Sequence, residues 1–541
     1  MSTFTPTQEQ DNAITFPQDM VVVAHPGSGK TGVLTQKIRR LLSEVRDYQG
    51  VIAISFTNKA SEELEHRCKA NGLDVKQSFF GTIDEFCLRE IIRPFARHVR
   101  LVAADMVTAK FGELPATLWP FLPSLPIQHA RLVDMPQFLP FLWAALAHGY
   151  IPLEAVGMLA CHIVDESPAC RRYLQARYRA VFIDEYQDSG CFQHQLFLKL
   201  RAAGLTAVAV GDGDQSIFAF AQKDPQYLLA LTQPGSGFAP FPITRNFRSH
   251  PSITDFSLRL LDPNHVVAPT SDMRVFLKTV IGDQIAVAQW LRTAIPHLMS
   301  NFGVVEAGRV AVLCRHQNSA RLIAEYLGLS HYLFEDSPFT RTPSGEAAVF
   351  SDLLKLRFNS QLTAQALLER RGIPGIGAAV TRKLRRALLR CRTCTDDDLG
   401  AAMIEAAACL LGQPPSLVGA TELQTICTDH SLLRRFASPA SDAVQIMTLH
   451  KAKGLEFDLV FHADLYDHVI PTRRYIDGNF DVVFENEQQC LNLHYVGITR
   501  AIQACVLLTS TARINNQGQQ KSGAPSQFLG RNGTSAVAIP W

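Results

Sequence analysis

The most regular feature of the chain is a series of short apolar runs, each followed by a polar loop. Residues 20–24 precede HPGSGKT, residues 180–183 precede DEYQD, and residues 206–210 precede GDGDQS. A fourth run at 51–55 leads into FTNKASEELEHRC. Repeated strand, loop and helix signals predict a parallel α/β sheet with ligands at the carboxyl ends of its strands. We therefore expect these four strands to form one nucleotide-binding core.

Helical periodicity follows two of these strands. After 51–55, Ala60, Leu64 and Cys68 recur every four residues and predict one face of a helix. The helix expected after the first strand carries apolar residues at helical spacing: Leu34, Ile38, Leu41 and Val45. Such alternation of strands and helices is typical of a layered α/β domain.

A second α/β unit begins near Arg309, where RVAVLC predicts a strand and NSARLIAEYL a helix, and it resumes at AVQIMTLH and LEFDLVFHADL. Two stretches interrupt the pattern: residues 95–175 are dense in proline, which predicts an irregular helical insertion, and residues 345–438 are helix-rich. We therefore predict four parts: a first core domain, 1–86 and 176–252, with its insertion 87–175, and a second core domain, 253–344 and 439–541, with its reduced insertion 345–438.

Composition supports several packed domains. The length of 541 residues predicts three to four domains at about 150 residues each. Hydrophobic residues make up 47% and charged residues 19%, which is typical of soluble globular proteins and excludes wholesale disorder. The 52 Lys and Arg against 50 Asp and Glu give a net charge of +2. That balance excludes a uniformly basic DNA-coating protein but leaves room for a local basic track.

Cysteine usage and hydropathy indicate a cytosolic protein. Twelve cysteines are scattered along the chain behind no recognisable signal peptide, so we expect reduced thiols. The longest apolar stretch, 138–147, contains Pro140 and is too short to span a bilayer. Cys391 and Cys394 form a single CxxC, but a four-cysteine metal site usually needs a second tight pair. Ordinary thiols are therefore favoured.

The loop after the first strand has the features of a phosphate-binding loop. Its sequence, AHPGSGKT, departs from GxxxxGK[ST] only at Ala24. Lys30 is expected to reach the β- and γ-phosphate oxygens, and Thr31 to bind Mg²⁺. The backbone expected to curl around the phosphates comprises His25, Pro26, Gly27, Ser28 and Gly29. The alternative, a glycine-rich turn that happens to end in Lys-Thr, does not account for the acidic end of another strand.

That acidic strand end is Asp184-Glu185, followed by Gln187 and Asp188. We expect Asp184 to hold Mg²⁺ through water, while Glu185 orients and deprotonates the attacking water. A lone Asp-Glu pair is usually a solvated turn, but its position directly after an apolar strand favours the catalytic interpretation.

In order along the chain, seven segments resemble the motifs of superfamily 1 helicases of the UvrD/Rep type. They are TQEQDNAI, SFTNKA, DEYQD, VGDGDQSIFAF, TRNFRS, MTLHKAKGLEF and YVGITRA. The order is much more specific than any one motif. The resemblance implies two RecA-like P-loop NTPase domains with parallel sheets and two mainly helical insertions, an arrangement called 1A/1B/2A/2B. It also implies an enzyme that hydrolyses ATP to ADP and phosphate with Mg²⁺ and moves on DNA, with 3′ to 5′ polarity.

The resemblance assigns further nucleotide contacts. Gln10 would read the adenine edge, Phe247 would stack on the adenine ring, and Glu456 would contact the ribose. The γ-phosphate would be contacted by three residues: Gln215, Arg248 and Arg500. Guanidinium groups on a movable domain stabilise transition-state charge only when the cleft closes. The resemblance therefore implies that ATP binding closes the cleft and that hydrolysis allows the cleft to open again.

Contacts to single-stranded DNA are implied for seven residues: Thr57, Asn58, Lys59, Phe218, Phe220, Thr448 and His450. Aromatic faces stack on any base, which suits a motor that reads no sequence. The alternatives are core packing for the two phenylalanines, and a helix-start histidine bonded to local backbone for His450.

The sequence also departs from the family pattern at three places. Ala221 and Gln222 stand where relatives usually have Arg-Gly, and neutral residues at 489–492 replace the common charged ones. Gly32 follows GKT, where relatives often carry Arg. We expect an active ATPase with altered coupling or a weaker hold on DNA.

A narrower resemblance concerns GTIDEFCLREIIRPF, residues 81–95, which is similar to the helicase subunit of Gabija anti-phage systems. It implies a separately encoded partner nuclease of the OLD type, with an ABC-like ATPase domain, and a role in defence. Two other interpretations stay open: a stand-alone repair or replication-restart helicase, and a non-motor, ATP-gated DNA-sensing or scaffold subunit, for which Ala221 is the best support.

A basic segment lies in the second insertion. Residues 370–392 contain eight basic residues and no acidic one, and IPGIG at 373–377 resembles the turn of a helix-hairpin-helix element. Arg382, Arg386 and Arg390 recur at intervals of four and share one helix face. They predict contacts to duplex phosphates. A solvated basic face, or a site for a partner's acidic surface, are the alternatives.

Overall fold

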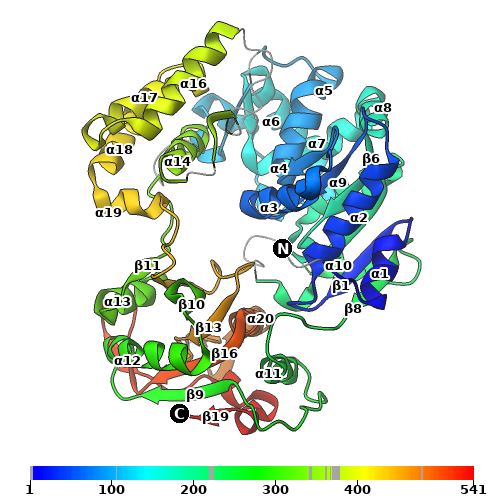
Figure 1. The fold of residues 1–541 in the computed structure, drawn as a ribbon. Coiled ribbons are helices and arrows are strands. Elements are labelled where there is room, and N and C mark those ends of the chain that lie inside the picture. Colours follow the sequence, from blue (N-terminus) through cyan, green and yellow to red (C-terminus); the bar gives the residue numbers. More distant parts are fainter. Residues whose placement is uncertain are drawn as a thin grey trace. The chain divides into compact units, whose positions relative to one another are not determined.

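The computed structural model describes residues 4–104, 106–217, 225–339, 344–359, 362–365, 367, 378–476 and 479–541. The chain divides into two compact units, one formed by Met1–Phe86, Ser167–Phe334 and Ala440–Trp541 and the other by Cys87–Glu166 and Glu335–Pro439 (Figure 1). The first unit contains both large sheets, so this division leaves the predicted four-part domain arrangement untested.

The first sheet of this unit has six strands in the order β3-β2-β6-β7-β1-β8, and all neighbours are parallel. The four strands predicted from the apolar runs are confirmed: β1 (Met20–Ala24), β2 (Gly50–Ile54), β6 (Tyr178–Ile183) and β7 (Thr206–Gly211). Two short outer strands were not predicted, β3 (Phe79–Gly81) and β8 (Ala239–Ile243).

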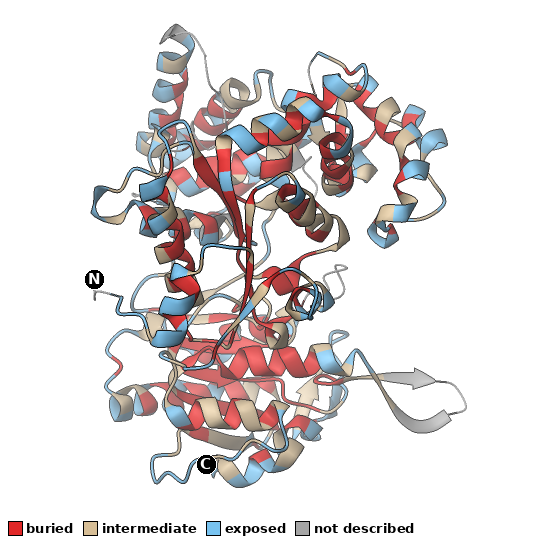
Figure 2. Ribbon diagram, turned by 90° about the vertical axis from the view of Figure 1, so that its right-hand side faces the viewer, coloured by how far each residue is buried: buried red, intermediate tan, exposed pale blue. Residues whose placement is uncertain are grey.

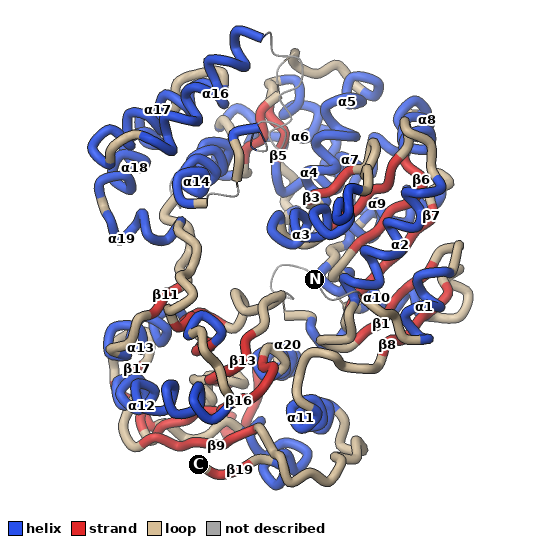
Figure 3. The backbone as a smooth tube through the Cα atoms, viewed as in Figure 1, coloured by secondary structure: helices blue, strands red, loops and turns tan. Residues whose placement is uncertain are grey.

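Continuous apolar runs form the middle of this sheet because its strands are covered on both faces. Figure 2 shows the buried interior of the strands, and Figure 3 shows helices on their flanks. The flanking helices are α1 (Gln8–Thr15), α2 (Lys30–Glu44), α3 (Asn58–Lys69), α8 (Pro168–Arg177), α9 (Cys191–Ala202) and α10 (Gln226–Thr232).

The predicted helix after β2 is confirmed as α3, with one correction to its inward face. Leu64 and Cys68 are buried, but Ala60 is exposed and Ser61 takes the inward position. A spacing of three between Ser61 and Leu64 follows the 3.6-residue period as well as a spacing of four does.

The second sheet has seven strands in the order β11-β12-β10-β13-β16-β9-β19, again with parallel neighbours. The predicted strands appear as β10 (Val310–Cys314), β12 (Val444–Thr448) and β13 (Phe457–His462), and the predicted helix as α13 (Gln317–Leu327). The remaining strands are β9 (Val275–Val280), β11 (His331–Leu333), β16 (Ala501–Ser510) and β19 (Ile539–Pro540). Two large parallel sheets are the architecture expected of two RecA-like lobes.

Further elements complete this unit. The helices around the second sheet are α11 (Pro251–Leu261), α12 (Gln284–Phe302) and α20 (Glu487–Ile498). A four-residue helix, α4 (Ile83–Phe86), follows β3. Two antiparallel pairs are β14 (Thr472–Ile476) with β15 (Asn479–Glu485), and β17 (Ala512–Ile514) with β18 (Gln520–Ser522).

The other compact unit is mainly helical. Its first segment contains a π-helical stretch (Cys87–Ile92), then α5 (Arg93–Val99), α6 (Met135–Ala147) and α7 (Val156–Glu166), with short 3-10 turns where prolines are frequent and a small parallel pair, β4 (Val107–Ala109) and β5 (Tyr150–Pro152). Its second segment contains α14 (Ser344–Phe358), α16 (Ala378–Thr393), α17 (Asp396–Leu411), α18 (Leu417–Thr428) and α19 (His430–Leu433).

The helices of the second segment enclose a core of their own that includes Leu353, Leu388, Met403 and Leu423. Within the described part of the chain, no helix combines the length and the apolar character needed to cross a membrane.

Candidate active site

The loop between β1 and α2 forms a tight cradle of backbone. Gly27 and Gly29 have φ of +71° and +80°, values that glycine adopts without strain. A Cβ atom at Gly27 would also lie 2.6 Å from the Cβ of Arg248, so the close approach requires glycine. The Lys30 ammonium donates to the Ala24 carbonyl at 3.0 Å, inside the loop. This is the geometry of a phosphate-binding loop at the N-terminus of a helix.

Helix α1 braces this loop through Gln10. The Gln10 side chain is buried, and its Nε2 donates to the Ser28 carbonyl at 2.8 Å. Its Oε1 accepts from the Thr7 backbone N–H at 2.9 Å. Two amide atoms of Gln10 therefore hold the loop and the helix start, and its role at the adenine edge stays a prediction.

The same helix is tied to two other segments. The backbone N–H and the hydroxyl of Thr244 donate to the Glu9 carboxylate at 3.0 and 3.1 Å. At the other end, the buried Lys37 of α2 donates to the carbonyls of Ala13 and Phe16. Helix α1 thus connects the phosphate loop, α2 and the segment that follows β8.

Asp184 and Glu185 lie at the carboxyl end of β6. Asp184 is buried, and its Oδ1 accepts from the Glu185 N–H at 2.9 Å. Burial, and then the charge of Glu185, raise the pKa of Asp184 to about 7. Burial alone would raise the pKa of Glu185, but the charges of Lys453 and Lys30 outweigh it and lower that pKa. The two neighbouring carboxyls therefore have different proton affinities, as a division of labour requires.

Lys453 is a site residue that the sequence reasoning missed. It follows β12, is only 8% exposed, and donates to Asp188 Oδ2 at 2.6 Å and to the Gln215 carbonyl at 2.7 Å. Its Nζ also lies 4.0 Å from Glu185 Oε2. The available signal was its place in MTLHKAKGLEF, but nothing in that segment separates it from Lys451 without the fold.

A buried chain of hydrogen bonds connects the second sheet to the first. Arg500 Nη2 donates to Gln215 Oε1 at 2.8 Å, and Gln215 Nε2 donates to Asp212 Oδ2 at 2.7 Å. Asp212 Oδ2 lies 3.7 Å from Lys30 Nζ. Burial, and then the charge of Arg248, lower the pKa of Arg500 to about 9. The predicted γ-phosphate sensor and one of the predicted arginines are therefore brought together beside the phosphate loop.

The other predicted arginine also lies beside this loop. Arg248 Nε donates to Glu456 Oε2 at 2.7 Å, so the residue expected at the ribose is paired with an expected γ-phosphate ligand. The Phe247 N–H donates to the Gly27 carbonyl at 2.8 Å, while the Phe247 side chain is 51% exposed. The Arg245 guanidinium lies over this ring, 4.9 Å from its centroid.

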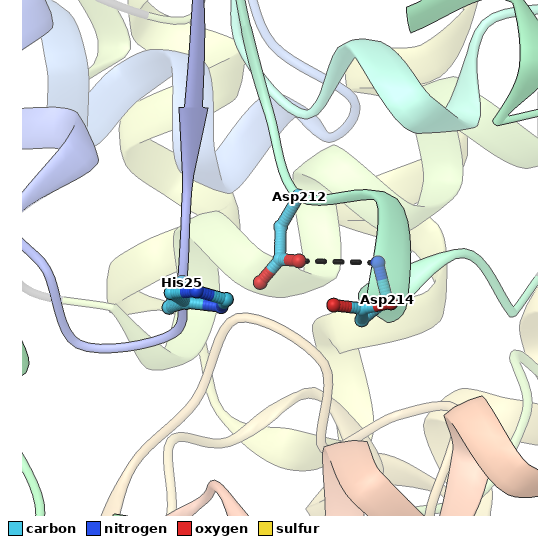
Figure 4. A group of neighbouring side chains, drawn as sticks. All are labelled: His25, Asp212 and Asp214. Carbon is cyan, nitrogen blue, oxygen red and sulfur yellow. Dashed lines mark hydrogen bonds between the residues drawn. The ribbon is translucent and has the colours of Figure 1, made fainter. Parts of the chain in front are cut away.

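His25, Asp212 and Asp214 form a compact group (Figure 4), and Asp212 is the member that faces Lys30. Their ligand atoms lie within 4.8 Å of one another, which is close enough for one metal ion. Asp212 Oδ1 accepts from the Asp214 N–H at 3.1 Å. Because Asp212 also faces Lys30 and Gln215, a cation bound here would compete with the lysine. The predicted metal ligands, Thr31 and Asp184, are not members of this group.

Two neutral residues of α20 support the loop after β7. Gln489 Nε2 donates to the Ile217 carbonyl at 2.8 Å, and Asn492 Nδ2 donates to the Ser216 carbonyl at 2.9 Å. From the sequence alone, these positions differ from relatives only in having neutral residues where charged ones are common. In the structure, their amides fix the segment that contains Gln215.

The predicted DNA contacts are less fully described. Thr57 is exposed and caps α3 by accepting from the Ala60 N–H at 3.2 Å. Asn58 and Lys59 lie on α3, but their side chains, and all of Phe218 and Phe220, lie outside the described residues.

Thr448 ends β12, and His450 lies in the turn that follows. Burial, followed by the charges of Arg315 and His316, lowers the pKa of His450 to about 4, so this imidazole is neutral at pH 7.

The structure describes the part of the basic segment that lies on α16. Arg382, Arg386 and Arg390 are all exposed, and Arg390 Nη1 in addition donates to Glu405 Oε2 on α17 at 2.7 Å. The turn IPGIG lies outside the described residues. Cys391 is buried and donates to the Ala402 carbonyl at 3.3 Å, as a structural thiol does.

Comparison with known proteins agrees with this geometry. The UvrD/REP helicase N-terminal domain matches residues 6–113 and 146–235, and the UvrD-like helicase C-terminal domain matches residues 413–512. The chain is 25% identical to the Gabija protein GajB of Bacillus cereus, over 87% of this chain and 94% of that protein. It is 24% identical to the ATP-dependent DNA helicase UvrD2 of Mycobacterium tuberculosis, over 96% and 80% of the two chains.

The ATP-dependent DNA helicase PcrA of Staphylococcus aureus is 22% identical, over 97% of this chain and 85% of PcrA. The matched domains and these relatives show that the chain belongs to the UvrD/Rep family of superfamily 1, the ATP-dependent DNA helicases.

Proposed function

We propose that the chain is a DNA-dependent ATPase that moves 3′ to 5′ along single-stranded DNA and acts in anti-phage defence with a separately encoded nuclease of the OLD type. The observation that carries the motor is the contact of Lys453 and Arg500, from the second sheet, with Asp188 and Gln215 of the first. Through these bonds, ATP turnover at the first lobe can change the position of the second lobe.

The residues at the phosphate loop fit magnesium and a triphosphate. Mg²⁺ prefers hard oxygen donors, and the Thr31 hydroxyl and Asp184 carboxylate are of that kind. A buried carboxyl with a raised pKa is also one that a divalent cation would hold in its charged form. When bound, the ion would neutralise phosphate charge, while Lys30 would contact the β- and γ-phosphate oxygens.

Glu185 would act on the attacking water. Its lowered pKa keeps it charged and able to accept a proton, and Gln187 Nε2 donates to its Oε2 at 2.5 Å and holds the carboxylate in place. Arg500 and Arg248 would stabilise charge on the γ-phosphate once their bonds to Gln215 and Glu456 are exchanged for phosphate oxygens.

Relative length supports the defence role. The match to GajB covers 94% of that protein, whereas the matches to UvrD2 and PcrA cover 80% and 85% of theirs. A stand-alone repair helicase is the second candidate, because UvrD2 and PcrA match 96% and 97% of this chain.

The motor is tested by steady-state ATP hydrolysis with and without single-stranded DNA, and by displacement of streptavidin from the 3′ or the 5′ end of a biotinylated oligonucleotide. We expect DNA to stimulate hydrolysis and only the 5′-end streptavidin to be displaced. Hydrolysis without DNA stimulation would favour the sensing or scaffold subunit instead.

The defence role is tested by plaque formation on cells that express the chain with its neighbouring nuclease gene, and by co-purification of the two proteins. Protection should require both proteins and be lost with Lys30→Ala. Robust unwinding by the purified chain, with no partner and no protection, would favour the repair helicase.

A further inference from the structure

Phe4 occupies the space that a side chain at residue 32 would fill. A Cβ atom on Gly32 would lie 2.7 Å from Phe4 Cε2 and 3.1 Å from Phe4 Cδ2. Real Cβ atoms do not approach a ring carbon so closely, so a side chain at residue 32 would push the Phe4 ring out of its present position. The ring thus lies against the first turn of α2, directly after Lys30 and Thr31.

The Phe4 ring also borders the phosphate loop itself. A Cβ on Gly29 would lie 3.7 Å from Phe4 Cε2 and 3.0 Å from Gln10 Nε2, so Phe4 and Gln10 flank the same glycine. The side chain of Phe4 nevertheless stays 36% exposed. An aromatic ring that packs one part on the loop and leaves another part open is suited to a flat ligand.

A second exposed ring is attached to the same loop. Phe247 is bonded through its backbone N–H to the Gly27 carbonyl, and its side chain is 51% exposed. The Phe4 ring therefore lies against Gly29 and Gly32, while Phe247, which also has an exposed ring, is bonded to Gly27 through its backbone. A nucleoside triphosphate carries its flat π-system at the end opposite to the phosphates that such a loop binds.

We propose that Phe4 contacts the base of the bound nucleoside triphosphate and takes the place of the side chain that Gly32 lacks. This inference rests on the proposed binding of the triphosphate by the loop that contains Lys30. It makes Phe4 a residue that binds the base, whichever base it is, and leaves the phosphates to the loop.

The test compares two ligands that share a triphosphate chain, of which only one carries a nucleoside. Binding of ATP and of inorganic tripolyphosphate to the full chain is measured by calorimetry for the wild type, Phe4→Ala and Phe4→Trp. Loss of a base–aromatic contact is expected to weaken ATP binding about tenfold in Phe4→Ala. Tripolyphosphate affinity should be unchanged, and Phe4→Trp should retain ATP affinity. Tyr48→Ala, which removes an exposed ring outside the phosphate loop, should leave both affinities unchanged.

A second arm uses the space that Phe4 and a side chain at residue 32 would both occupy. Gly32→Arg should weaken ATP binding because its side chain collides with Phe4. The double variant Phe4→Ala, Gly32→Arg should bind ATP more tightly than either single variant, since the guanidinium then has space and can itself stack on a base.

Two results would overturn the inference. If Phe4→Ala weakens the binding of tripolyphosphate as much as the binding of ATP, Phe4 only supports the loop. If Phe4→Ala changes neither affinity, Phe4 contacts no part of the ligand. Because the comparison reads binding, it does not depend on whether the chain hydrolyses ATP or moves on DNA.

Discussion

The nucleotide site and the candidate DNA contacts differ in how their side chains are held. Gln215 and Arg500 are buried, and each has hydrogen-bond partners from other parts of the first unit. Thr57, which caps α3, and Arg382 and Arg386, which lie on α16, are exposed. Hydrolysis needs donors fixed at one geometry, whereas binding to a polyanion of any sequence needs charges that can adjust.

The difference also sets what a substitution costs. Removing one partner from a buried polar network leaves the other group without compensation, which is costlier than the loss of an exposed charge. We therefore expect large effects at the nucleotide site and small, salt-dependent effects at the DNA contacts.

The largest effect tests the buried side of this comparison. Lys30→Ala and Glu185→Gln should each lower DNA-stimulated ATP hydrolysis at least about a hundredfold, because they remove phosphate charge stabilisation and water activation. Steady-state phosphate release measures this, with circular dichroism to verify the fold. If both variants retain ATP hydrolysis, the assignment of the catalytic residues is wrong.

Lys453→Met tests whether a residue from the second sheet belongs to the same buried network. It removes the ammonium group that lies 2.6 Å from the Asp188 carboxylate, so the free energy of unfolding should fall by about 3 kcal/mol. The rate of ATP hydrolysis should also fall strongly. Urea unfolding and phosphate release measure the two effects. Lys451→Met is the matched control, since Lys451 donates to the Phe334 carbonyl, away from the catalytic carboxyls. Equal losses in the two variants would contradict a specific role for Lys453.

The exposed side is tested on α16. Arg382→Ala with Arg386→Ala should weaken binding to duplex DNA severalfold, and each lost phosphate contact should lower the slope of log affinity against log salt by about 0.9. Fluorescence anisotropy at several salt concentrations measures both.

Arg390→Ala is the internal comparison for this pair. It should change the salt slope less, because its guanidinium is bonded to Glu405. A larger effect of Arg390→Ala than of the double variant would place the DNA on a different face of the helix.

The smallest effect concerns the cysteines of the same helix. Cys391 is buried and bonded to a carbonyl, so EDTA should leave the thermal midpoint of the free protein unchanged. A drop of several degrees on chelation, reversed by zinc, would show that the CxxC segment holds a metal.

Prediction from sequence worked where a local pattern determines the structure. The apolar runs before polar loops located β1, β2, β6 and β7, because a strand buried on both faces needs a continuous apolar run. Strand β8 was missed because its sequence, APFPI, contains two prolines, which are tolerated only at an edge.

At the site, residue types with one chemical use were easier to predict than residues defined by long-range contacts. The positions of the loop glycines with Lys30 after β1, and of the Asp184-Glu185 pair after β6, could be predicted because spacing and strand context determine them, while their chemical roles stay predictions. Lys453 and Phe4 could not, since a lysine among several, or a phenylalanine before the first helix, acquires its place only from segments far away in the chain.

Helix α1 has only eight residues, yet it is bonded to the phosphate loop, to α2 and to Thr244. If ATP binding closes the cleft as the family resemblance implies, we expect these parts to move as one rigid piece. The bending would then fall on the short connection between Phe247, whose N–H donates to the Gly27 carbonyl of the phosphate loop, and Ser249, whose hydroxyl donates to the Ala501 carbonyl of the second sheet. We expect this connection to be the mechanical joint of the protein, where the residues that would contact the nucleotide also bend.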